Sequence, residues 1–169
     1  MGTFSYLGKE NENLIKMYTT ARQFRNAIKP SEILQFKKDG FENKVFPYVV
    51  NRSFSCEVYL KLIIKNNGDS FENVHNIKQL LVKAKIGEEF EKYILKGVAL
   101  ANVDYSIERL DQDIETISKA FVNWRYIYEQ DDITVAAGLL DLMNDYLDSY
   151  CKRIIKDRFD VDMDQYPFI

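Results

Sequence analysis

The chemistry open to this chain is limited by its few histidines and cysteines. Its 169 residues include one histidine, His75, and two cysteines, Cys56 and Cys151. Any site that needs two histidines from one chain is therefore excluded, and so are zinc sites with four cysteines or with three cysteines and a histidine. Both cysteines lie within apolar helical patterns, where buried, inert thiols are far commoner than nucleophiles.

Motifs for common metals and cofactors are incomplete or missing. Asp160, Asp162 and Asp164 have the spacing of the first three calcium-loop ligands, but Gln165 stands where that loop needs glycine. No Gly-x-x-x-x-Gly-Lys-Ser/Thr or Gly-x-Gly-x-x-Gly loop is present to hold phosphate groups. We therefore predict no metal and no cofactor, and we assign no catalytic residue.

Charged residues interrupt the most apolar helical stretch. Glu57 and Lys61 are four residues apart with the acid first, which is the favourable order for an ion pair on a helix. The pair either fixes the packing of this helix or, with nearby Arg52, faces a binding cleft.

Two further sites combine polar and aromatic residues. Arg125 and Tyr126 close the strongest apolar seam, where the arginine either bonds terminal carbonyls or, with the tyrosine, forms a corner that stacks on and binds phosphate. His75 precedes the helix-capping residue Asn76, a position at which a histidine is more often structural.

The elements that would position these residues are helices. Apolar residues recur at helical spacing, with capping or terminating residues at several ends. The predicted helices cover residues 14–28, 46–66, 76–84, 88–100, 103–128 and 136–154, and residues 31–37 add one short turn before Asp39-Gly40. The two seams from Val103 to Tyr128 and from Ala136 to Ile154 are predicted to pack antiparallel at about 20°.

Composition and patterning favour one globular unit. The chain is 46% hydrophobic and 29% charged, with a net charge of −3, which suits a single packed core. We predict an all-α, up-and-down bundle of about five main helices over residues 1–169. No stretch has eighteen uninterrupted apolar residues, so we expect no membrane span, and two thiols in apolar helices indicate a cytoplasmic protein.

Several short motifs together resemble the HEPN family (higher eukaryote and prokaryote nucleotide-binding domain). They are the Glu57-x-x-x-Lys61 element, a turn at Gly68, a His75-Asn-Ile helix start, and Trp124-Arg-Tyr126 before the last helix. The family has glycine before the histidine, and this chain has Val74. The resemblance covers about residues 21–150.

This resemblance implies a helical bundle that forms homodimers and acts in RNA cleavage, toxin–antitoxin pairs or phage defence. Ribonuclease members use Arg-x₄₋₆-His, which is missing here because Gln130, Asp131 and Asp132 follow Arg125 at the required distances. We therefore expect a divergent member that binds a nucleotide, RNA or a protein partner without hydrolysis. Its expected ligand-binding residues are Arg125, Tyr126, Arg52, Glu57, Lys61 and His75.

Two alternatives stay open from the sequence. The first is a pure protein-interaction module, such as an antitoxin or an immunity-type neutraliser, which would bind its partner through exposed aromatic and apolar residues. The second is a ribonuclease in which Glu129 or Tyr128 replaces the histidine. An exposed apolar patch would favour the first alternative, and a basic cleft around Arg52 and Arg125 would favour nucleotide binding.

Overall fold

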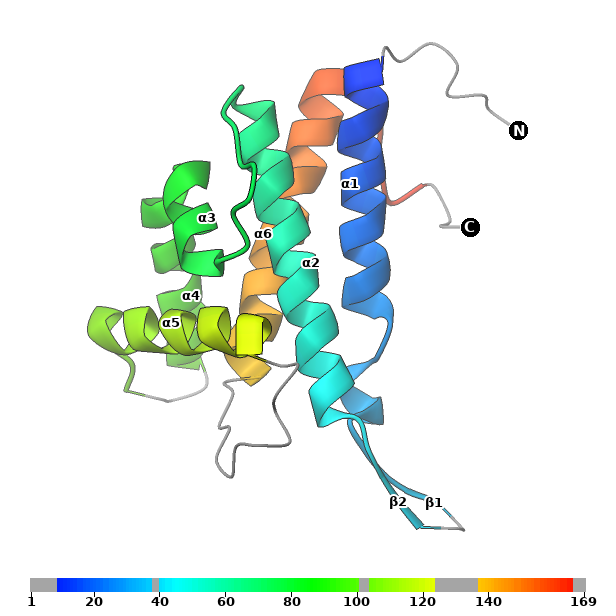
Figure 1. The fold of residues 1–169 in the computed structure, drawn as a ribbon, viewed down its shortest axis with the longest axis vertical. Coiled ribbons are helices and arrows are strands. Elements are labelled where there is room, and N and C mark those ends of the chain that lie inside the picture. The colour runs from blue at the N-terminus through cyan, green and yellow to red at the C-terminus, as the bar shows by residue number, and fades with distance from the viewer. Residues whose placement is uncertain (1–8, 38–39, 101–103, 124–136, 166–169) are drawn as a thin grey trace.

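The fold is a bundle of helices with one short hairpin (Figure 1). The computed structural model describes residues 9–37, 40–100, 104–123 and 137–165. In chain order the elements are α1 (Lys9–Asn26), a 3-10 helix (Pro30–Glu32), β1 (Leu34–Lys37), β2 (Gly40–Asn43), α2 (Val45–Asn66), α3 (Ile77–Ala84), α4 (Gly87–Leu100), α5 (Ile107–Asn123) and α6 (Ala137–Phe159). The predicted helical bundle is confirmed, with six α-helices in the described part of the chain.

Helix α2 lies in the middle of the bundle, packed between α1 and α6 and against α3 (Figure 1). Leu60, Leu62 and Ile63 point in different directions around this helix, and each is fully buried. Small residues allow a close approach, since Ser55 Oγ donates a hydrogen bond to the carbonyl oxygen of Ala21 on α1 at 2.8 Å. A helix that is apolar on nearly all sides must be covered on nearly all sides, which is why α2 takes the central place.

Helices α3, α4 and α5 form a smaller group on one side of α2 (Figure 1). The prediction that the fifth and sixth helices pair lengthwise is wrong, because α5 runs across α2 and packs on α3 and α2. Leu110, Ile114 and Ile117 of its seam are buried. An apolar seam shows which face of a helix is covered, but it does not specify which helix covers it.

Helix α4 attaches this group to α6. The Phe90 ring meets Tyr146 edge-on with centroids 5.6 Å apart. Farther along, a Cβ at Gly97 would lie 2.8 Å from Leu142 Cδ2, so the absence of a side chain at this position allows the two helices to approach. The buried residues of all six helices join in one hydrophobic core.

An antiparallel hairpin projects from one end of the bundle, beyond the start of α2 (Figure 1). Its register pairs Leu34 with Asn43 and Phe36 with Phe41. The predicted helical turn over 31–37 is therefore wrong for its second half, and only Pro30–Glu32 is helical there. Strands of four residues contain too few apolar–polar alternations for a period of two to be recognised.

None of the helices in the described ranges combines the length and apolar character that a membrane-crossing segment requires.

Candidate functional site

Three of the six predicted site residues come together on one side of α2. Lys61 Nζ lies 2.7 Å from Glu57 Oε1, and His75 Nδ1 lies 3.0 Å from the same oxygen. The Glu57 side chain is 3% exposed, whereas the His75 ring is 63% exposed. The predicted Glu57–Lys61 ion pair is confirmed, and the structure adds His75 as a second partner of the buried carboxylate.

This cluster fixes one end of α3. His75 directly precedes Asn76, whose Oδ1 accepts a hydrogen bond from the Gln79 amide at 3.0 Å and caps the helix as predicted. The other end of α3 is also tied to α2, because Asn67 Nδ2 donates to the carbonyl oxygen of Ala84 at 3.2 Å. The Glu57 cluster therefore helps to set the position of α3, which lies on the outer side of the bundle.

Arg52 lies on a different face of α2. Five residues along a helix turn the side chain through about 140°, so Arg52 and Glu57 face different neighbours. Arg52 Nε lies 3.3 Å from Asp141 Oδ1 on α6, and the Tyr48 hydroxyl donates a hydrogen bond to the same carboxylate oxygen. Burial and this hydrogen bond raise the pKa of Tyr48. Arg52 is 8% exposed, so its guanidinium is buried beside α6 and does not face solvent.

The remaining two predicted residues, Arg125 and Tyr126, lie outside the described residues. The same is true of Glu129 and Tyr128, the proposed substitutes for a catalytic histidine. Among the expected ligand-binding residues that the structure describes, Arg52 does not join the Glu57 cluster, because Arg52 contacts Asp141 on α6 whereas Glu57 contacts His75 before α3.

A buried carboxylate on α6 has four polar partners in the described part of the chain, and the sequence reasoning missed it. Asp148 Oδ1 accepts hydrogen bonds from the hydroxyls of Tyr18 at 2.9 Å and Tyr59 at 2.7 Å. Asp148 Oδ2 lies 3.0 Å from Arg25 Nη1 and 3.3 Å from Lys152 Nζ. Burial, with the Asp148 charge second, raises the pKa of both tyrosines.

A local signal for this network exists in the sequence. Asp148 stands four residues after Asn144 and seven before Ile155, so it shares their side of α6, and all three are buried. An acid on a core face needs partners. Each oxygen of Asp148 has two, and the network joins α1, α2 and α6 as a structural unit.

The two cysteines are buried and free, as predicted. Burial raises the pKa of Cys56 to about 12, and burial also raises the pKa of Cys151. Neither thiol is therefore activated as a nucleophile. No group of three potential metal ligands lies close together in the described ranges.

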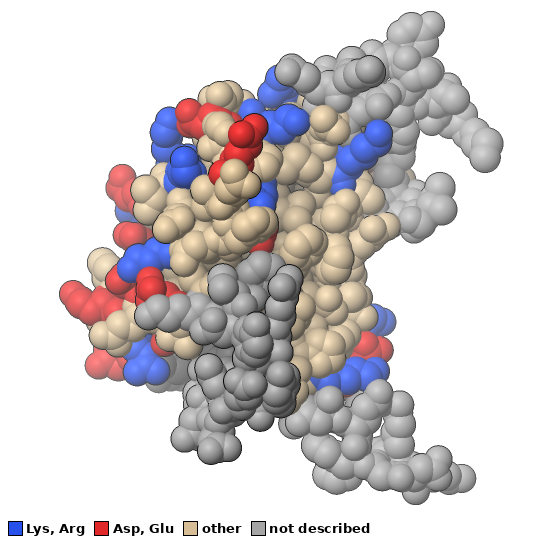
Figure 2. All heavy atoms as spheres, viewed as in Figure 1, with Lys and Arg blue, Asp and Glu red and all other residues tan. Residues whose placement is uncertain are grey.

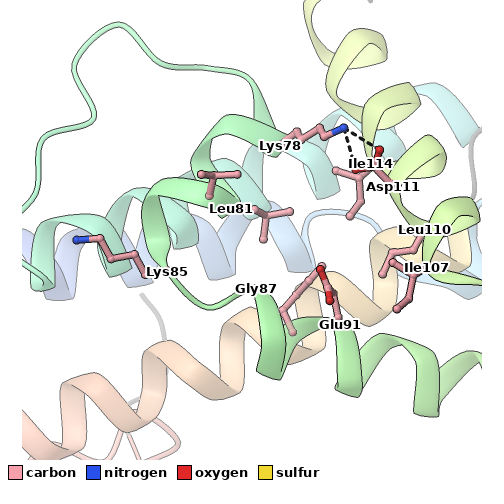
Figure 3. A pocket seen from close by; sticks show the side chains of 11 residues that line it. Lys78, Leu81, Lys85, Gly87, Glu91, Ile107, Leu110, Asp111 and Ile114 are labelled. Carbon is pink, nitrogen blue, oxygen red and sulfur yellow. Dashed lines mark hydrogen bonds and ion pairs between the residues drawn. The ribbon is translucent and has the colours of Figure 1, made fainter.

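An apolar concavity with a volume of about 350 Å³ lies among α3, α4 and α5 (Figure 3). We call it the α3–α5 groove. Leu81 lies on α3, Gly87 and Glu91 on α4, and Ile107, Leu110 and Ile114 on α5, around one common space (Figure 3). The complete lining is Lys78, Leu81, Val82, Lys85, Gly87, Phe90, Glu91, Ile107, Leu110, Asp111 and Ile114.

The edge of the groove exposes apolar residues that sequence reasoning did not single out. Val82 is 75% exposed, and Ile107, which was predicted to face inward with the α5 seam, is 54% exposed. Lys78 closes one end, with Nζ 2.8 Å from Asp111 Oδ1, and this hydrogen-bonded carboxylate raises the pKa of Lys78. Large aliphatic side chains in water beside an apolar concavity are typical of a surface that binds another molecule.

A second pocket shares part of its lining with the groove. It has a volume of about 490 Å³ and is lined by Asn76, Lys78, Gln79, Val82, Lys83 and Glu115. Lys78 and Val82 line both concavities. Figure 2 shows acidic and basic side chains interleaved over this side of the molecule.

In comparisons with known proteins, no family model, no curated protein and no solved structure matches this chain.

Proposed function

We propose that this chain is a HEPN-like binding protein without hydrolytic activity, and that it binds another protein chain in the α3–α5 groove. The observation that carries the proposal is the groove itself, an apolar concavity of about 350 Å³ with Val82 and Ile107 exposed at its edge. A partner that buries these two side chains gains about 25 cal/mol for each Å² of apolar surface removed from water.

The charges at the groove edge indicate the character of the bound segment. On the α3 side, Lys78 is paired with Asp111 of α5 and Lys85 with Asp69, while Glu91 lies on the α4 side. A partner segment that fits would present apolar side chains to the bottom of the groove and a basic residue toward Glu91.

Binding of RNA or a nucleotide is less well supported, because the candidate cations already have carboxylate partners. Arg52 is paired with Asp141, and Lys61 with Glu57. A phosphate group would have to displace these carboxylates before it gained either cation. The resemblance to HEPN proteins of toxin–antitoxin and defence systems suits a partner-binding role equally well.

Selection from a displayed library of amphipathic helical peptides tests the proposal. Peptides selected on the unmodified protein should lose at least tenfold in affinity for Val82→Glu and for Ile107→Glu. The matched control is Leu100→Glu, because Leu100 is also apolar and 79% exposed but does not line the groove. Its affinity should stay within twofold of the unmodified protein.

Two results would contradict the proposal. One is a set of selected peptides whose affinity is the same for the groove variants and the Leu100→Glu control. The other is retention or cleavage of labelled RNA by the unmodified protein with no peptide binding, which would favour the nucleic-acid alternative.

A further inference from the structure

A polar pocket that the proposed function does not use lies between the start of α4 and the second half of α6. Its volume is about 230 Å³, and its lining is Glu89, Tyr150, Arg153, Ile154 and Asp157. It is separate from the α3–α5 groove, because Glu89 stands about 200° around α4 from Glu91, which lines the groove. We infer that this α4–α6 pocket binds a small zwitterion, such as a free amino acid, whose ammonium group meets the two carboxylates and whose carboxylate meets Arg153.

The pocket carries charges of both signs because of the spacing of residues on α6. Tyr150, Arg153 and Asp157 follow one another at intervals of three and four residues, which places them on one face of the helix. Arg153 and Asp157 are about one turn apart, or about 6 Å along the helix axis. Glu89 adds a second carboxylate from the first turn of α4. A ligand in the pocket therefore lies beside one guanidinium and two carboxylates.

These three charges do not neutralise one another. In the ranges that the structure describes, no ion pair joins Arg153 to Asp157 or to Glu89. Arg153 precedes the acid, which is the less favourable order for a pair one turn apart, and its guanidinium lies over the Tyr150 ring, 5.1 Å from the centroid. A ligand can therefore pair with these groups without first displacing an internal ion pair, whereas a ligand of Lys61 would have to displace its carboxylate.

A buried tyrosine behind the pocket is an independent sign of a polar ligand. The Tyr146 ring is held between α4 and α6, with its centroid 5.6 Å from that of Phe90 and 5.8 Å from that of Tyr150. Tyr146 is 6% exposed, and its buried hydroxyl has no hydrogen bond of normal geometry among the described residues. Burial, followed by the nearby charge of Glu89, raises the pKa of Tyr146 to about 12. The hydroxyl is therefore protonated at neutral pH and can donate a hydrogen bond to a ligand or to a water that the ligand holds.

The size of the pocket limits the ligand. Liquid water occupies about 30 Å³ per molecule, so a volume of about 230 Å³ corresponds to about eight non-hydrogen atoms of ligand. Small amino acids such as glycine, alanine and valine meet this limit, and Ile154 offers a contact for a short aliphatic side chain. Because Glu89, Arg153 and Asp157 are exposed, solvent weakens their attraction for the ligand, and we expect a dissociation constant on the order of 1 mM.

Amide NMR spectroscopy of the full chain during ligand titration tests the inference. The probe is L-alanine. Its two controls are propionate, which lacks the ammonium group, and ethylamine, which lacks the carboxylate. Alanine should give saturable shifts at the residues of the α4–α6 pocket. At the same ionic strength each control compound should bind about tenfold more weakly, because it keeps only one of the two charged contacts.

Matched variants locate the two ends of the ligand. Glu89→Gln should weaken alanine binding by about fivefold or more, whereas Glu88→Gln should leave it within about twofold, because Glu88 is on the same turn but does not line the pocket. Arg153→Gln should also weaken binding by about fivefold or more. Its control is Arg158→Gln, an exposed arginine of α6 outside the pocket, which should bind as the unmodified chain does. Circular dichroism melting confirms that each variant is folded.

Three results would overturn the inference. The first is the absence of saturable shifts at alanine concentrations of about 50 mM, well above the expected dissociation constant. The second is binding of ethylamine or propionate as tight as that of alanine, which would indicate a site for a simple cation or anion. The third is an equal effect of each pocket variant and its control. All three leave the proposed function untouched, because its test uses peptides and variants of Val82 and Ile107.

Discussion

Replacement of Asp148 by alanine should be among the most destabilising single changes in this protein. Its Oδ1 accepts hydrogen bonds from Tyr18 and Tyr59, two side chains that are fully buried. Hydrogen bonds to a charged group contribute about 1.5–3 kcal/mol each. The ion pairs to Arg25 and Lys152, which are 21% and 29% exposed, add at most about 1 kcal/mol.

Loss of one member from a buried charged network costs about 3–5 kcal/mol, and we expect a loss of about 4 kcal/mol for Asp148→Ala. Urea unfolding followed by circular dichroism measures the change. With a slope of about 2 kcal/mol per M, the midpoint should fall by about 2 M. The matched control is Asp145→Ala, since Asp145 also pairs with Arg25, at 2.5 Å, but is 48% exposed. It should cost under about 1 kcal/mol.

A double-mutant cycle locates the cause of the loss. Tyr59→Phe should destabilise the unmodified protein by about 1.5–3 kcal/mol. In the Asp148→Ala background it should cost little, because the hydroxyl has already lost its acceptor. Equal losses for Asp148→Ala and Asp145→Ala, or an unchanged effect of Tyr59→Phe in both backgrounds, would refute the assignment of Asp148 as the acceptor that holds three helices together.

Two further predictions follow from the same buried groups. Folding raises the pKa of Tyr59, so as the pH rises above about 10 the unfolded chain loses the phenol proton before the folded chain does. The contribution of Tyr59 to the free energy of unfolding is therefore fully present below about pH 10. Above that pH it falls by about 1.4 kcal/mol per pH unit. In Tyr59→Phe this proton is absent, so the urea midpoint should fall less steeply with pH than in the unmodified protein. Identical slopes for the two proteins would contradict the burial of a protonated phenol. Glu57→Ala should cost about 3 kcal/mol, because it leaves Lys61, 15% exposed, without its carboxylate. His75→Ala should cost under about 1 kcal/mol, because its ring is 63% exposed. Equal losses in thermal melting of these two variants would show that Lys61 is not the main partner.

Interactions that are local in sequence were the ones that could be predicted. The bounds of α2, α3 and α4 follow from apolar spacing together with Asn76 as the cap, and the observed ends lie within one residue of the prediction. The Glu57–Lys61 pair also spans a single helical turn. The hairpin was missed because its strands are too short for their alternation to be recognised.

Interactions between distant residues could not be predicted in the same way. Asp148 meets Tyr59 across 89 residues and Tyr18 across 130, and nothing in the local pattern indicates which hydroxyls an inward-facing acid will reach. The groove was hidden for a related reason. Ile107 continues the apolar spacing of α5, and the pattern does not reveal that α3 and α4 leave its first turn uncovered.

Helix α3 connects the polar residues inside the bundle with the apolar groove on its surface. This helix has only eight residues, and isolated helices shorter than about 12–15 residues are marginal in water, so its position depends on its attachments. The contact of His75 with Glu57 holds the start of α3, and the hydrogen bond from Asn67 to Ala84 holds its end. Between them, Ser118 of α5 accepts a hydrogen bond from the Lys78 amide at 3.1 Å. Glu57 is therefore a positioning residue for one wall of the groove, although it does not line it. Glu57, which the sequence associated with ligand binding, thus contributes by holding one wall of the groove for which we propose a partner.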